Sequence, residues 1–132
     1  MPPPVVLACL FAAATAAPGA SAAAEPAGAE VSFNRAVRPI LSDHCFPCHG
    51  PDSAQRKADL RLDTEAGCLV DLGGHRAIVP GDTEASELVR RITAVDPDER
   101  MPPADFERPL SAEQIALLKN WIAQGAKWQG HW

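Results

Sequence analysis

The sequence predicts a small domain of the all-α class, in which a few helices are joined by long ordered loops. Three segments have the periodicity of amphipathic helices, and no segment alternates like a strand over more than a few residues. The loops are rich in proline and glycine, with 13 and nine of these residues in a chain of 132. A chain of this length holds one compact domain rather than two.

The first helix is expected at about residues 33–43. Ser32 precedes it as the expected N-cap. Pro39 lies inside the segment and predicts a kink or a late helix start, because proline has no N–H to donate. Apolar residues at positions i, i+4, i+7 and i+8 would form one buried face, made of Phe33, Val37, Ile40 and Leu41.

The second helix is expected at about residues 83–92. The turn dipeptide Pro80-Gly81 comes before it, and Asp82 follows that dipeptide as the expected cap. Its buried face would consist of Ala85, Leu88, Val89 and Ile92.

The third helix has the clearest boundaries. Ser111 and Gln114 have the spacing of a capping box, and Gly125 supplies the stop. The apolar face of this helix would contain Ile115, Leu118 and Ile122, with Trp121 beside them. A weaker, shorter helix is expected at about residues 64–70.

Residues 1–22 have the composition of a secretory signal peptide. They carry no charged side chain, and an apolar block leads into small residues that end in an Ala-x-Ala pattern. We expect cleavage after Ala22, with Ala24 as the alternative, then a flexible lead-in at residues 23–30 and the folded domain at residues 31–132. No Lys or Arg precedes the apolar block, so a disordered alanine-rich leader is the competing interpretation.

The location expected from this leader is periplasmic or otherwise extracytoplasmic. The apolar block is shorter than the roughly 20 residues that span a bilayer, so no stable membrane insertion is expected after cleavage. The chain has 12 Lys and Arg against 17 Asp and Glu, a net charge of −5, and no basic stripe typical of a nucleic-acid site. Its partners are therefore expected to be neutral or basic proteins.

Cys45-Phe46-Pro47-Cys48-His49 is the attachment pattern of a c-type haem. The two thiols have the spacing of the porphyrin's vinyl groups, with which they form thioethers, and the adjacent histidine binds the iron. We therefore expect one covalent haem c, attached through Cys45 and Cys48. A haem would also supply the large apolar body that long loops in a small domain need to pack against.

Two other chemistries fit a Cys-x-x-Cys pair. A thiol-disulfide module of thioredoxin type would place the pair between a strand and a helix. A zinc site would combine the pair with Cys68 and one of His44, His49 or His75, although the second ligand pair lacks a recognisable spacing. Four cysteines are present, but Cys9 leaves with the leader, and the odd number left does not suggest a disulfide framework.

Met101 is the expected second axial ligand of the iron. It is the only methionine after the leader, and it lies in a charged, proline-stiffened loop where a methionine has little reason to be core. The competing ligands are His44, His75 and His131, each of which is more readily explained as a surface histidine. If Met101 is not bound, the open distal site would belong to a haem enzyme or a gas sensor.

Other residues have weaker assignments. Arg61 and Arg76 are candidates for contact with the haem propionates, with an ordinary surface position as the alternative for each. Three aromatic residues are expected to pack on the porphyrin or in the core: Phe46, Trp121 and Trp128. Cys68 is expected to be a small buried residue on the short helix.

Several stretches, in this order, resemble the planctomycete-type cytochrome c module, a small haem domain found at the N-terminus of larger secreted proteins. They are residues 33–41 (FNRAVRPIL), 45–51 (CFPCHGP), 60–63 (LRLD), 78–82 (IVPGD), 98–103 (DERMPP), 110–121 and 125–126. The resemblance covers about residues 31–132. It implies a cytochrome c-like helical fold, thioethers at Cys45 and Cys48, His49 as proximal ligand and Met101 as distal ligand.

The function expected is electron transfer by a single haem with His/Met axial ligation. The protein would be an electron carrier and not an enzyme by itself. Its partner would be a separate redox protein or further domains of a longer chain, since members of this family usually continue past the stretch that ends at Trp132. Cys68 has no role in the family pattern.

Overall fold

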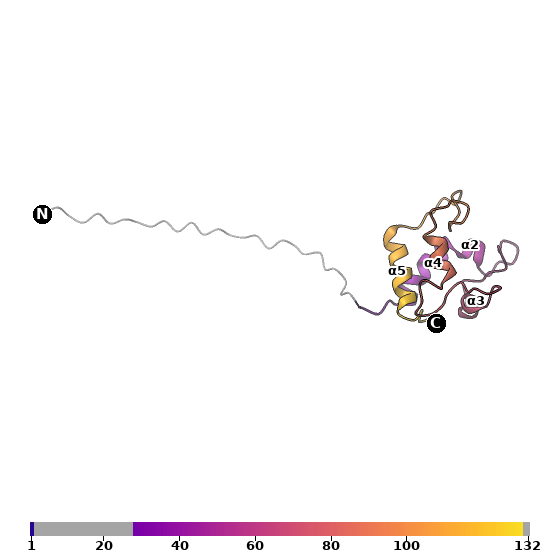
Figure 1. The fold of residues 1–132 in the computed structure, drawn as a ribbon, viewed down its shortest axis with the longest axis horizontal. Helices are drawn as coiled ribbons and strands as arrows, with labels where there is room; N and C mark the ends of the chain where they lie inside the picture. The colour runs from indigo at the N-terminus through magenta and orange to yellow at the C-terminus, as the bar shows by residue number, and fades with distance from the viewer. Residues whose placement is uncertain (2–27, 131–132) are drawn as a thin grey trace.

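The computed structural model describes Met1 and residues 28–130 of the chain. The expected signal peptide, its cleavage site, most of the lead-in and His131 therefore lie outside the described residues. The described part is a small, helix-rich body with no named strand, so the prediction of a small helical domain is confirmed for it (Figure 1). No helix in this part of the chain is long and apolar enough to cross a membrane.

The first expected helix has two parts. One π-helical turn, η1 (Phe33–Val37), leads directly into α1 (Arg38–His44). Pro39 lies in the first turn of α1, and the wider π turn just before it relieves the clash of its ring with a preceding carbonyl. The late helix start is thus confirmed. Ser32 stands at the N-cap position, but its side chain makes no capping bond, and its hydroxyl donates to Gln129 Oε1 at 3.1 Å instead.

Two short helices follow. The first, α2 (Phe46–His49), had no counterpart in the sequence prediction. The second, α3 (Glu65–Leu69), is the weak helix that the sequence predicts, and the Thr64 hydroxyl accepts its capping hydrogen bond from the Gly67 N–H at 3.1 Å.

The second expected helix is shorter than predicted, because α4 begins only at Glu87 (Glu87–Ile92). Asp82 caps a turn rather than the helix, since its carboxylate accepts from the Ala85 N–H at 3.0 Å. Ala85 is exposed, so the prediction that it belongs to the buried face of this helix was wrong. Ser86 is fully buried and its hydroxyl bonds to Val79 and Asp82, which holds the preceding turn against the start of α4.

The third expected helix, α5 (Ala112–Ala123), has the predicted ends. Ser111 and Gln114 form both hydrogen bonds of the capping box, and Gly125 follows the helix with a φ of 104°. Trp121 is 1 % exposed, and its indole N–H donates to the Lys127 carbonyl at 3.1 Å.

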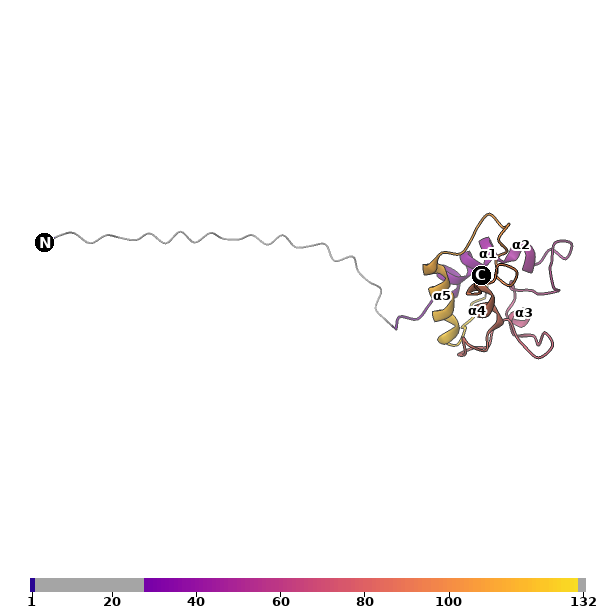
Figure 2. The ribbon, with the colours of Figure 1, turned by 45° about the horizontal axis from the view of Figure 1, so that its top comes forward.

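The core packs η1 against α5, and α4 also contacts α5. Phe33 has its ring centroid 5.4 Å from that of Trp121 and 4.0 Å from that of Trp128. In Figures 1 and 2, α5 borders the domain on one side, α4 lies in the middle, and α2 and α3 lie on the other side. The predicted apolar face of the first helical segment is buried at all four positions: Phe33, Val37, Ile40 and Leu41.

Candidate functional site

A cavity of about 660 Å³ lies between α2, α4 and the loops that follow them. Its size falls in the range of cofactor pockets in proteins. The four residues predicted for the site all line it: Cys45, Cys48, His49 and Met101. The remaining wall is largely apolar and includes Leu60, Leu62, Leu72, Leu88, Ile92 and Phe106.

The corner between α1 and α2 places both thiols on this cavity. Cys45 ends α1 and caps α2, and its carbonyl accepts from the His49 N–H at 2.8 Å. The turn therefore puts Cys45 and Cys48 on the same side of the chain, three positions apart. Gly50 ends α2, and a Cβ there would lie 2.3 Å from the Phe46 carbonyl oxygen, so this close turn requires glycine.

His49 is oriented by a backbone carbonyl that the sequence did not identify. Its Nδ1 lies 3.2 Å from the Lys57 carbonyl oxygen. A carbonyl can only accept, so Nδ1 carries the proton and Nε2 keeps a free lone pair, the form that binds a metal. Burial lowers the pKa of His49, against the opposing effect of the Lys57 hydrogen bond. Two backbone bonds, from Lys57 N–H to Cys48 and from Leu62 N–H to His49, hold the loop in place.

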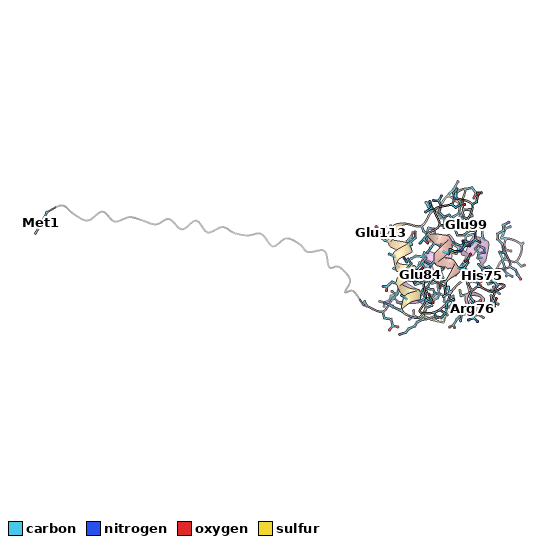
Figure 3. All side chains as sticks on the ribbon, viewed as in Figure 1. Met1, His75, Arg76, Glu84, Glu99 and Glu113 are labelled. Carbon is cyan, nitrogen blue, oxygen red and sulfur yellow. The ribbon has the colours of Figure 1, made fainter. Side chains whose placement is uncertain are left out.

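Met101 reaches the cavity from a loop anchored on α4. Its N–H donates to the Arg91 carbonyl at 3.0 Å, at the end of the helix. The Arg91 guanidinium donates back to the Glu99 carbonyl at 3.3 Å, and Arg90 forms an ion pair with the Glu99 carboxylate at 3.0 Å. Glu99 lies beside α4 in Figure 3. The loop is thus tied to the helix immediately before Met101.

The thiol of Cys45 does not have the properties of a reactive cysteine. Burial, and then the neighbouring Cys48, raise the pKa of Cys45 to about 12, whereas a reactive cysteine has a lowered pKa. The pair lies between two helices, not between a strand and a helix. Within residues 28–130, no three His, Cys, Asp or Glu side chains gather as a metal site, so the zinc alternative has no support there.

The alternative histidine ligands differ in their surroundings. His44 lines the cavity but is half-buried, and both of its ring nitrogens are hydrogen-bonded, to Arg108 and to Gln114. The interpretation of His44 as a solvated surface residue was wrong. His75 is exposed and also lines the cavity, next to two glycines with positive φ (Figure 3).

The propionate candidates Arg61 and Arg76 do not line the cavity. Arg61 instead forms an ion pair with Asp63 at 2.6 Å. The basic residues at the cavity are Lys57 and Arg91, which the sequence could not distinguish from other surface cations.

The aromatic residues that were expected on the porphyrin or in the core do not line the cavity. Phe46, Trp121 and Trp128 are absent from the cavity wall and pack in or on the core. Phe106, which sequence reasoning overlooked, lines the cavity instead. Cys68 is 2 % exposed on α3, as expected for a small buried residue, and its Sγ lies 3.6 Å from the Leu62 carbonyl oxygen.

The donors at the cavity fit a covalently attached haem. Two thiols on one turn, a histidine with a free Nε2 and a thioether sulfur converge on an apolar space. Residues 45–105 of the chain match the family model described as Planctomycete cytochrome C. No curated protein and no solved structure matches the chain. The family match begins at the first of the two thiols and extends past the methionine, so it spans all four predicted residues.

Proposed function

We propose that this chain transfers electrons through one haem c with His/Met ligation. Residues 45–105 match the model of a cytochrome c family, which suggests haem-based electron transfer in general. Cys45 and Cys48 would hold the group by thioethers. His49 and Met101 would bind the iron from its two faces. The observation that supports this proposal is the convergence of these four side chains on one cavity.

A haem iron held by these residues would supply one-electron chemistry. The chain's own residues set the conditions for it. The largely apolar wall would lower the polarity around the iron, which favours the less charged reduced state. Lys57 fixes the ring of His49 through its carbonyl, and α4 holds the loop before Met101. Ligands that are held in this way move little when the oxidation state changes.

The thioether sulfur at the second axial position also favours an electron carrier over an enzyme. A filled position leaves no place for an external substrate on the iron, whereas catalysis or gas sensing needs an open one. We propose a redox protein, or further domains of a longer chain, as the partner. The extracytoplasmic location typical of the family is compatible with the uncharged leader.

The test is the absorption spectrum of the chain after co-expression with a haem-attachment system. We expect a covalent c-type spectrum and, in the oxidised protein, a weak near-infrared band from sulfur ligation. Met101→Ala should abolish that band and allow carbon monoxide to bind the reduced protein. Val95→Ala, an exposed change in the segment that follows α4, should leave both unchanged.

Four outcomes would contradict the proposal. Absence of covalent haem would exclude a c-type cytochrome. A wild-type protein without the near-infrared band would exclude methionine ligation, and so would an unchanged spectrum in Met101→Ala. Rapid carbon monoxide binding by the wild-type protein would favour the open distal site of an enzyme or sensor.

A further inference from the structure

The part of the cavity wall that follows Met101 in the sequence makes few hydrogen bonds to the rest of the described protein. Residues 102–110 form this segment, which we call the distal loop, and Pro102, Pro103, Asp105 and Phe106 line the cavity from it. Among the hydrogen bonds and ion pairs between described residues, a single one joins the distal loop to another part of the chain. It runs from His44 Nδ1 to the Arg108 carbonyl oxygen, at 2.7 Å.

His44 has one hydrogen-bond partner on each ring nitrogen. The Arg108 carbonyl can only accept, so Nδ1 is the donor of that bond. The second nitrogen, Nε2, lies 3.3 Å from Nε2 of Gln114. The amide oxygen of Gln114 accepts from the Ser111 N–H in the capping box, so its NH₂ group faces His44 and donates. The two ring nitrogens of His44 thus face different partners, the Arg108 carbonyl at Nδ1 and the Gln114 amide group at Nε2.

His44 lies where three segments of the fold meet. It is the last residue of α1 and immediately precedes Cys45, the first thiol of the attachment turn. Arg108 lies 64 positions further along the chain, and Gln114 lies in the first turn of α5. One imidazole thus connects the segment that would hold the haem, the distal loop and the start of α5.

We propose that His44 is a positioning residue that latches the distal loop over the cavity and thereby keeps Met101 at the second axial position. This inference rests on the proposed function. Met101 is held from one side by the bond of its own N–H to Arg91. The hydrogen bond between His44 and the Arg108 carbonyl restrains the chain on the C-terminal side of Met101. Without it, the distal loop could swing away and take the methionine sulfur with it, although the remainder of the core would stay intact.

The test compares variants of the haem-loaded full chain by the near-infrared band and by the rate of carbon monoxide binding to the reduced protein. Carbon monoxide must displace the sulfur, so this rate reports how often Met101 leaves. His44→Ala removes both hydrogen bonds and should raise the rate roughly tenfold, the value expected for one net hydrogen bond. His44→Asn keeps an N–H donor near the place of Nδ1 and should remain close to wild type. His44→Gln places its amide further out and should resemble alanine.

Gln129→Ala is the matched control. Gln129 Oε1 accepts from Ser32 and from the Asn34 N–H, so this change also removes two hydrogen bonds between segments distant in sequence, but away from the cavity. If the effect of His44→Ala were merely structural, carbon monoxide binding would be accelerated as much in Gln129→Ala. That result would overturn the proposed positioning role of His44. An unchanged rate in His44→Ala would overturn it as well.

The comparison of His44→Asn with His44→Gln keeps the test valid if His44→Ala does not fold. Equal rates in these two variants would overturn the role of the Arg108 bond. The failure of the proposed function has a different signature. In that case the wild-type protein itself would lack the near-infrared band and would bind carbon monoxide without delay, whatever residue stands at position 44.

Discussion

Glu87 holds two arginines at the start of α4, and its replacement gives a test of how this helix is stabilised. The Glu87 carboxylate accepts two hydrogen bonds from Arg90, at 2.6 and 2.8 Å, and a third from Arg91 at 2.9 Å. The same arginines contact Glu99 before Met101. Glu87→Gln keeps the shape of the side chain and removes its charge.

The magnitude follows from the pKa of this carboxyl group. Arg90 above all, and then Arg91, lower the pKa of Glu87 from 4.5 to about 2 against the effect of burial. The fall of the Glu87 pKa from 4.5 to about 2 corresponds to at most about 3.4 kcal/mol, at about 1.36 kcal/mol for a tenfold change in the proton-binding constant. The Arg90 side chain is 48 % exposed, so solvent screening reduces the contribution. We expect Glu87→Gln to lower the free energy of unfolding by about 1–2 kcal/mol at pH 7.

The pH dependence has a definite sign. Because the folded-state pKa lies below the unfolded-state pKa, the unfolded chain binds the proton first as the pH falls. The contribution of Glu87 is therefore complete above the unfolded-state pKa of 4.5 and is lost progressively towards about pH 2. The difference in stability between wild type and Glu87→Gln should shrink over the same interval.

The assay is urea unfolding of the haem-loaded protein, followed by far-ultraviolet circular dichroism between pH 7 and pH 3. Glu84→Gln is the control, because Glu84 is exposed in the turn before α4 and has no ion pair among the described residues (Figure 3). A difference between wild type and Glu87→Gln that stays constant with pH would refute the electrostatic explanation. Equal stability of the two at pH 7 would do the same.

Two further predictions concern α3. Gly67→Ala should cost about 1–3 kcal/mol in thermal or urea unfolding, because its Cβ would lie 2.2 Å from the Arg61 carbonyl oxygen, whereas Gly130→Ala, with open space around it, should have little effect. Cys68 should resist alkylation at pH 8 in the native haem-loaded protein and react once urea unfolds it, because burial above all raises its pKa from 9.0 to about 12 and lowers the thiolate fraction roughly a thousandfold. Rapid native alkylation would show that α3 opens readily.

Features that depend on neighbouring residues could be predicted from the sequence. The capping box at Ser111 and the stop at Gly125 are local, so the ends of α5 were predictable. The pattern Cys45-x-x-Cys48-His49 is equally local, and it predicts an attached haem without reference to the rest of the fold. The start predicted for the helix at residues 83–92 was wrong. The buried hydroxyl of Ser86 and its contacts with Val79 outweigh the local capping signal of Asp82.

The hydrogen-bond partners of the site residues, and their convergence on one cavity, depend on the tertiary structure. Hydrogen bonds between residues distant in sequence depend on the path of the chain, and composition and periodicity do not record that path. The convergence of Met101 with the Cys-x-x-Cys-His turn, the Lys57 carbonyl on His49 and the Arg108 carbonyl on His44 are all of this kind. The sequence thus predicted which residues belong to the site, and the fold shows which backbone carbonyls orient His49 and His44.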